Sequence, residues 1–207
     1  MRIERQFIAV AAAGLALTLA ACGGAGSGAL TKINADEPSL GKADAPVTII
    51  EYASTACGHC ATFNNDVFHE FKAKHIDTGD VHYAMREIVT PPESFAMASF
   101  VLARCAPSEK YYPIIDAVFR GQYTMLTTNT VAEGLKQIAA SAGMSDADYQ
   151  KCIQDEANFE ALEKRLVKNA TEGKITATPT FYINGKKHEG ELTLAALSKA
   201  VTDAKAK

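Results

Sequence analysis

Val47-Thr48-Ile49-Ile50-Glu51-Tyr52-Ala53 is followed, after three residues, by Cys57-Gly58-His59-Cys60, and these two stretches decide the fold. The first stretch is rich in β-branched residues and has the length of a strand. Behind the cysteines the apolar side chains Phe63, Val67 and Phe71 recur every fourth residue, which predicts one face of a helix. The sequence therefore places two cysteines, separated by two residues, where a strand passes into a helix.

A second strand is expected shortly after that helix. Thr78-Gly79-Asp80 ends the helix, and Val81, Tyr83 and Met85 then alternate in the manner of a strand. A strand, a helix and a strand in this order form a βαβ unit, whose two strands are parallel. Residues 92–173 follow and are predicted to be almost wholly helical.

Strand-forming sequence returns after the helical block. Thr180–Ile183 and Lys186–Glu189 flank Asn184-Gly185, which is a strong hairpin signal, and Thr193 can cap a final helix. The predicted order is β-α-β, a helical block, then β-β-α. The two flanking parts are expected to form one α/β unit around a sheet, with the helical block inserted between them.

The first residues have the pattern of an export signal. Two arginines precede the nearly apolar run Phe7–Leu19, which leads into Leu19-Ala20-Ala21-Cys22. These last four residues resemble the lipobox of bacterial lipoproteins, so residues 1–21 are interpreted as a signal peptide and Cys22 as the lipidated first residue. Residues 22–35, glycine-rich at their start, would form a tether. The alternative is ordinary signal cleavage, with Cys22 left as a free thiol.

The export signal and the composition indicate where the protein works. Residue 23 is Gly and not Asp, which by the sorting habit of lipoproteins favours the outer membrane. We therefore expect the periplasmic side of a bacterial cell envelope, with membrane contact through the N-terminal lipid. The net charge is −3, from 21 Lys+Arg and 24 Asp+Glu, and no dense basic run occurs. This excludes a nucleic-acid binder that works by neutralising phosphates.

The cysteines carry the predicted chemistry, because disulfides persist in an exported protein. Cys57 is expected at a helix N-terminus, where free N–H groups and the helix dipole lower the pKa of a thiol, and a protonated His59 would stabilise the thiolate further. A stabilised thiolate makes the disulfide a better oxidant. Cys57 would be the nucleophile and Cys60 the resolving cysteine. The alternative is a structural disulfide or half a zinc site, but Cys105 and Cys152 do not have the spacing of a second zinc-ligand pair.

The chain resembles the thioredoxin-fold superfamily, and its insertion points to the DsbA-like branch of thiol:disulfide oxidoreductases. The resemblance rests on Cys57-Gly58-His59-Cys60 directly after a strand, and on Glu51 six residues before Cys57. It also rests on Ala177-Thr178-Pro179-Thr180-Phe181 and on the segment Gly41–Pro46. The resemblance extends over residues 36–203.

This resemblance implies a fold and a substrate site. The fold is an α/β thioredoxin domain of residues 36–91 and 174–207, interrupted by a helical insertion domain of residues 92–173. Pro179 is expected to be cis, although cis bonds are uncommon before proline in general. Thr178 would present backbone groups to an extended substrate peptide.

The resemblance also assigns roles to three further residues. Glu51 would have a raised pKa and relay a proton to or from Cys60, the alternative being a carboxylate solvated at a wet end of the strand. Cys105 and Cys152 would form a second, structural disulfide without a catalytic role, as in DsbA-like proteins with a second bridge. The alternative for this pair is two buried free thiols.

The predicted function is that of an exported DsbA-like oxidant, which exchanges its Cys57–Cys60 disulfide with cysteine pairs of envelope proteins. By resemblance, a membrane quinone-linked oxidoreductase would reoxidise it, and neither a cofactor nor a metal is expected. A disulfide isomerase or a thioredoxin-like reductase is the enzymatic alternative. A copper-binding assembly lipoprotein with Cys57, His59 and Cys60 as ligands is the alternative from another class, which the dispersed methionines and the missing distal histidine disfavour.

Overall fold

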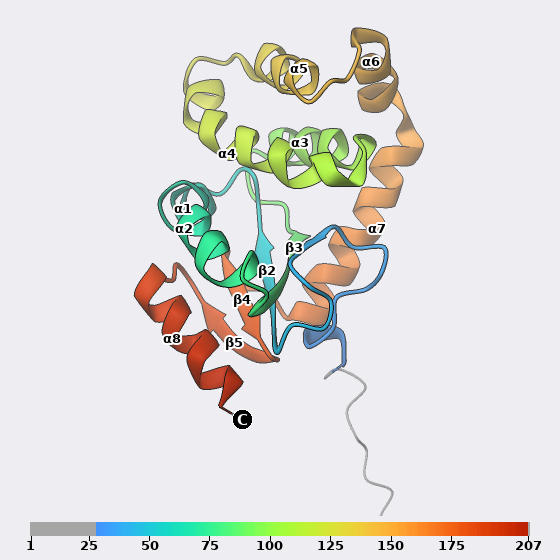
Figure 1. Cartoon of the computed structure of the whole chain (residues 1–207). Coiled ribbons are helices and arrows are strands. Elements are labelled where there is room, and N and C mark those ends of the chain that lie inside the picture. Colours follow the sequence, from blue (N-terminus) through green and yellow to red (C-terminus); the bar gives the residue numbers. More distant parts are fainter. Residues whose placement is uncertain (1–27, 207) are drawn as a thin grey trace, which may run out of the picture.

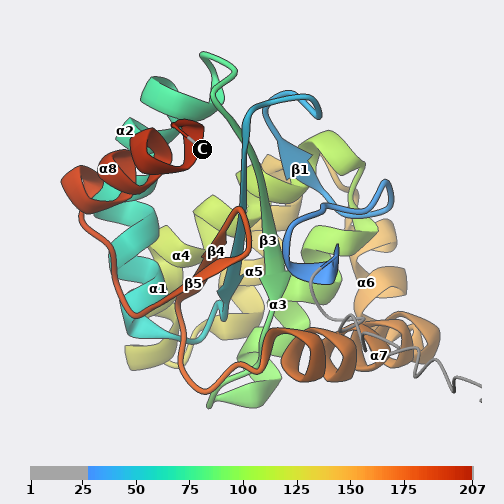
Figure 2. The same ribbon diagram turned by 90° about the horizontal axis from the view of Figure 1, so that it is seen from below.

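A five-stranded sheet forms the centre of the molecule and has helices on both faces (Figures 1 and 2). The computed structural model describes residues 28–206, so the predicted signal peptide (residues 1–21) and Cys22 lie outside the described residues. The strands lie across the sheet in the order β1-β3-β2-β4-β5. Their bounds are β1 Ser39–Leu40, β2 Val47–Ala53, β3 Val81–Glu87, β4 Thr180–Ile183 and β5 Lys186–Glu189.

The strand pairing is that of the predicted α/β fold. β2 and β3 are parallel, with Glu51 opposite Met85, and β4 runs antiparallel to both β2 and β5. The predictions of β2, the start of β3 and the β4–β5 hairpin are confirmed. The sequence did not predict β1, a two-residue strand that pairs antiparallel with β3 through Ser39 opposite Ala84.

The helix after the cysteines departs from the predicted regular helix. It runs as α1 (Gly58–Phe63) and α2 (His69–Phe71), each followed by a π-helical turn, at Asn64–Phe68 and Lys72–Ile76. The apolar side chains of this segment recur every four residues, which is longer than the 3.6-residue turn of an α-helix. The wider π-helical turns keep such a stripe on one face.

The predicted helical block contains five α-helices, and an eighth helix ends the described chain. Their bounds are α3 Glu93–Cys105, α4 Tyr111–Thr127, α5 Val131–Ser141, α6 Asp146–Gln154, α7 Glu156–Gly173 and α8 Leu194–Lys205. Figure 1 shows α3 to α6 stacked beyond the end of the sheet where β2 and β3 finish, with α7 leading back along the sheet. The prediction of a thioredoxin fold interrupted by a helical insertion is confirmed.

One continuous apolar core runs from the sheet into the insertion. It includes Phe71 and Phe181 near the sheet and Phe100 and Val118 in the insertion, all essentially without solvent exposure. The opposite face of the sheet has a smaller cluster around Tyr52. Because the main core is shared, the insertion is fixed against the end of β2 from which the cysteines follow.

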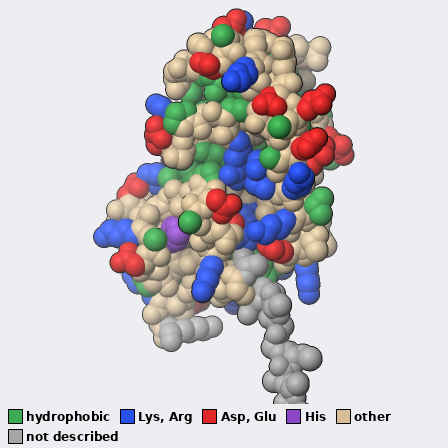
Figure 3. Space-filling view, turned by 90° about the vertical axis from the view of Figure 1, so that its right-hand side faces the viewer, with side chains coloured by type: hydrophobic (Ala, Val, Ile, Leu, Met, Phe, Trp, Pro, Cys, Tyr) green, Lys and Arg blue, Asp and Glu red, His purple; other side chains and the backbone are tan. Residues whose placement is uncertain are grey.

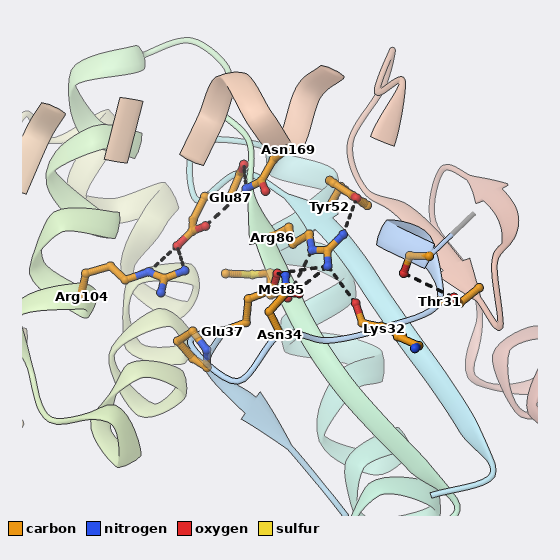
Figure 4. A network of polar contacts seen from close by, with 12 residues as sticks. Thr31, Lys32, Asn34, Glu37, Tyr52, Met85, Arg86, Glu87, Arg104 and Asn169 are labelled. Atoms are coloured by element: carbon orange, nitrogen blue, oxygen red, sulfur yellow. Dashed lines mark hydrogen bonds and ion pairs between the residues drawn. The ribbon is translucent and has the colours of Figure 1, made fainter. Parts of the chain in front are cut away.

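A buried ion pair also fixes the insertion to the sheet (Figure 4). Glu87, at the end of β3, is 1% exposed and lies 2.5 Å from the Arg104 guanidinium of α3. Tyr111 donates a hydrogen bond to the same carboxylate at 3.2 Å, and Asn169 of α7 donates to the Glu87 carbonyl at 3.0 Å. Three helices of the insertion thus meet the end of a single strand.

The N-terminal segment covers the second face of the sheet. Arg86 of β3 is 3% exposed and donates to the carbonyl of Lys32, to the Glu37 carboxylate and to the Tyr52 hydroxyl (Figure 4). A Cβ built on Gly185, at the tip of the β4–β5 hairpin, would lie only 2.7 Å from Thr31. The described chain therefore begins at the end of the sheet opposite to the cysteines.

Most charges of α7 are divided along the helix. Glu156, Glu160 and Glu163 precede Lys164, Arg165 and Lys168, and one further acidic residue, Glu172, lies near the C-terminal end. Acidic groups near a helix N-terminus interact favourably with the helix dipole. Figure 3 shows a group of basic side chains across the middle of the visible face, with most of the acidic side chains above it.

Candidate active site

Cys57 and Cys60 occupy the junction between β2 and α1. Cys57 is the N-cap residue of α1, with extended backbone, and Cys60 lies in the first turn of that helix. Both are free thiols in this structure, and Cys57 is partly exposed whereas Cys60 has no exposed surface. The accessible sulfur is therefore that of Cys57. The cysteine that reacts first with a substrate has to be accessible in this way.

The environment of Cys57 favours its thiolate. Hydrogen bonding from the Cys60 thiol is the largest cause that lowers the pKa of Cys57, which falls to about 5 although burial opposes it. A hydrogen bond with Thr178 and those from the backbone N–H groups of Cys60 and His59 add to the effect. A thiol with such a pKa is almost fully ionised at neutral pH.

The His59 side chain lies at the exposed edge of this arrangement. Its ring is 78% exposed, and its Nδ1 lies 2.5 Å from Oε1 of Glu191, in the loop between β5 and α8. The hydrogen bond and the charge of Glu191 raise the pKa of His59, and the charge of Cys57 adds to this. Sequence reasoning identified His59 but missed Glu191, which no spacing relates to the cysteines.

Cys60 and Glu51 form the buried side of the site. Burial, the hydrogen bond with Cys57 and the charge of Glu51 raise the pKa of the Cys60 thiol. Glu51 is only 3% exposed, and its burial raises the pKa of its carboxyl to about 8. The alternative of a solvated carboxylate is therefore wrong. The Tyr83 hydroxyl of β3 donates a hydrogen bond to Glu51 Oε2, a contact that sequence reasoning did not foresee.

Thr178 and Pro179 lie against the cysteines. The peptide bond between them is cis, as expected, and the Cys57 Sγ lies 3.3 Å from the Thr178 carbonyl oxygen. The Pro179 carbonyl accepts a hydrogen bond from the Gly190 N–H at 2.9 Å, which joins this segment to the loop that contains Glu191.

The insertion contributes one side chain to the site. Gln122 of α4 is 6% exposed, and its amide donates to the Thr55 carbonyl at 2.6 Å and to the Cys57 carbonyl at 3.1 Å. These hydrogen bonds attach the loop between β2 and α1 to helix α4 of the insertion. Sequence reasoning missed Gln122, because a single glutamine after Gly121 carries no signal of its own.

The other two cysteines within residues 28–206 have no part in this arrangement. Cys105 of α3 and Cys152 of α6 form a disulfide with a Cα–Cα distance of 6.0 Å, the pairing that the resemblance implies. Among residues 28–206, no three His, Cys, Asp or Glu side chains are grouped so as to hold a metal ion. None of the helices in the same range has the length and apolar character needed to cross a membrane.

Comparison with known proteins gives a consistent set of relatives. The family described as thioredoxin matches residues 34–203. A protein named "Putative protein-disulfide oxidoreductase" from Rickettsia bellii is 29% identical over 180 residues, which cover 85% of this chain and 69% of that protein. "Disulfide bond formation protein D" of Bacillus subtilis is 25% identical over 152 residues, covering 72% of this chain and 68% of the relative.

A solved structure extends the likeness to the fold. The crystal structure of alpha-DsbA1 from Wolbachia pipientis superposes with a TM-score of 0.79 at 26% sequence identity and covers 87% of this chain and 96% of that one. The further Rickettsia relatives are longer, and this chain spans 62% to 63% of their length.

Proposed function

Because the chain belongs to the thioredoxin family and is a DsbA-like protein-disulfide oxidoreductase, we propose that it acts as an oxidant that transfers its Cys57–Cys60 disulfide to cysteine pairs of exported proteins. The observation that supports an oxidant over a reductant is the stabilised Cys57 thiolate, whose pKa is about 5. Stabilising the reduced form raises the reduction potential of the pair, so the disulfide accepts electrons more readily.

The exchange proceeds in two displacements. A substrate thiolate attacks Sγ of Cys57, the Cys57–Cys60 bond breaks, and Cys60 leaves with the electron pair. The second substrate thiolate then attacks the substrate sulfur of the mixed disulfide and releases Cys57 as its stable thiolate. The substrate loses two electrons and the pair gains them.

Glu51 supplies the proton that the first displacement requires. Cys60 leaves into a buried site where its thiolate is strongly disfavoured. Glu51, with a pKa of about 8, is mostly protonated at neutral pH and can protonate that sulfur directly or through one water. Thr178 and Pro179 provide backbone groups along which an extended substrate segment can lie.

The cellular setting belongs to the same proposal. Cys22 would bear the lipid, in the outer membrane by preference, on the periplasmic side of the envelope. The described chain begins near the tip of the β4–β5 hairpin, at the end of the sheet away from the start of α1 (Figure 1), so an anchor would join the molecule at that end. Reoxidation would require a membrane quinone-linked partner.

The test is the equilibrium of the Cys57–Cys60 pair with glutathione, measured on protein lacking residues 1–22. The oxidant function predicts a potential above about −180 mV, the value of protein disulfide isomerase, and toward about −120 mV, the value of DsbA. A potential near about −270 mV, as in thioredoxin, would make the protein a reductant. Oxidation of a two-cysteine peptide should be lost in Cys57→Ser and kept when Cys105 and Cys152 are both alanine.

A further inference from the structure

Glu191 contacts His59, which lies between the two reactive cysteines in sequence, although 132 residues separate Glu191 from His59. Its carboxylate is in contact with the His59 ring and with no other cation that the described residues bring to it. We propose that Glu191 is a positioning residue that holds the His59 imidazole, as a cation, beside the Cys57 thiolate and thereby sets the redox poise of the pair. The inference rests on the redox function proposed above.

The loop that contains Glu191 is fixed on both sides. The Gly190 N–H donates to the Pro179 carbonyl at 2.9 Å, and Gly190 has a φ of +85°, which glycine adopts without strain. Two residues after Glu191, Thr193 caps α8 by accepting a hydrogen bond from the Ala196 N–H at 3.2 Å. The carboxylate is thus held at a defined place relative to the cis-proline segment.

His59 is equally constrained at its backbone. It is the second residue of α1, and its N–H is among the groups that hydrogen-bond to the Cys57 sulfur. Its side chain contacts the Glu191 carboxylate, and the charges of Glu191 and of the Cys57 thiolate both raise its pKa. The pKa of the imidazole therefore depends on whether the Cys57–Cys60 pair is reduced.

The redox consequence follows from the charge of the ring. Glu191 raises the pKa of the imidazole above 6.5, so a larger fraction of the ring is charged at neutral pH, and a cation near the thiolate favours the reduced form. Reduction then takes up two electrons and one proton, which goes to Cys60. Without Glu191 the largest cause of the raised His59 pKa is gone, so a smaller fraction of the ring is charged at neutral pH. The thiolate then interacts with less positive charge, and the disulfide becomes a weaker oxidant.

The first experiment compares Glu191→Gln with a matched control, Glu189→Gln. Glu189 is also exposed on the same segment, but it contacts Lys187 and Thr176 instead of His59. At pH 7.5 we expect the glutathione equilibrium constant of Glu191→Gln to shift toward the disulfide by about two- to five-fold, the range of exposed ion pairs. At pH 5.5, where His59 is protonated in every variant, the shift should vanish or reverse, because the carboxylate itself repels the thiolate.

The second experiment shows whether Glu191 acts through His59. In a double-mutant cycle, Glu191→Gln should not weaken the oxidant in the His59→Ala background. The NMR titration of His59 in the oxidised protein should have its midpoint at lower pH in Glu191→Gln than in the parent, and be unchanged in Glu189→Gln.

Three results would overturn the role of Glu191. These are an equal shift in both His59 backgrounds, the same shift in Glu189→Gln, and an unaltered His59 titration in Glu191→Gln. A parent protein that does not exchange with glutathione at all would instead refute the proposed redox function. The His59 titration remains measurable in that case, so the two failures are distinguishable.

Discussion

Replacing Glu51 with glutamine removes a buried titration, and the effect on stability can be worked out from the structure. Burial raises the pKa of this carboxyl from 4.5 to about 8 in the folded chain. Below pH 4.5 the carboxyl is protonated in both the folded and the unfolded state. As the pH rises toward 8, the unfolded state releases the proton while the folded state retains it, so the folded state loses relative stability.

The magnitude follows from the size of the pKa difference. Each pH unit within this window lowers the free energy of unfolding by up to about 1.4 kcal/mol. Between pH 5 and pH 8 the parent should therefore lose about 3–4 kcal/mol that Glu51→Gln retains. The absolute stability of the variant is less informative, because the buried amide has its own hydrogen-bonding needs. The pH dependence of the difference between the two proteins is the quantity to measure.

The assay is guanidinium unfolding of the oxidised proteins at pH 5, 6, 7 and 8. Oxidation keeps Cys57 and Cys60 from titrating, and all other titrating groups are common to both proteins and drop out of the difference. We expect the stability of Glu51→Gln relative to the parent to increase steadily over this range. A difference that stays constant within about 0.5 kcal/mol would refute the reasoning, because it would mean that the folded carboxyl is hydrated.

Three further predictions concern neighbouring groups. Tyr83→Phe removes a hydrogen bond that lowers the pKa of Glu51, so in the same unfolding series the loss of stability should extend to higher pH than in the parent. The thiolate absorbance of the reduced protein near 240 nm should titrate with a midpoint of about pH 5 and be absent in Cys57→Ser; a midpoint near the ordinary thiol value of 9.0 would contradict the assigned environment. Arg104→Met leaves the Glu87 carboxylate buried without its partner and should lower the stability by about 3–5 kcal/mol in denaturant unfolding, whereas adding Glu87→Leu should restore most of it. A double variant no more stable than Arg104→Met would show that the unpaired charge is not the cause.

The strands were predictable where local sequence determines them. β2 and the β4–β5 hairpin lie where the β-branched run and Asn184-Gly185 put them. β1 was not predictable, because a two-residue strand has no periodicity and exists only through its pairing with β3. The π-helical turns after α1 were missed for a different reason. An apolar side chain at every fourth residue fits both a regular α-helix and a helix with π-helical turns. Packing of these side chains against the core determines which of the two forms.

The site residues likewise fall into those that the sequence predicts and those that only the fold brings together. The cysteines and Pro179 belong to motifs that the sequence displays directly, and the resemblance to a known family implied the cis bond. Tyr83, Gln122 and Glu191 come from β3, α4 and the loop before α8, and only the folded chain brings them to the cysteines. For His59 the motif predicted the residue but not the position of its ring. That position depends on a contact with the Glu191 carboxylate, which is distant in sequence.

Glu51 and Cys57 affect the reaction in different ways, and their pH linkages separate the two effects. The raised pKa of Glu51 removes stability as the pH rises from 4.5 to 8, whereas the lowered pKa of Cys57 adds stability as the pH rises from about 5 to 9.0. Only the reduced protein has the Cys57 titration, but both redox forms have the buried carboxyl, since burial is the largest cause of its shift. The contribution of Glu51 therefore largely cancels between the two forms, and Cys57 sets how strongly the pair accepts electrons. We accordingly expect Glu51→Gln to slow thiol exchange, because Cys60 loses its proton donor, while the glutathione equilibrium constant changes little. An equilibrium constant that moves as much as the rate would mean that Glu51 interacts with the thiolate as a charge and does not serve chiefly as an acid.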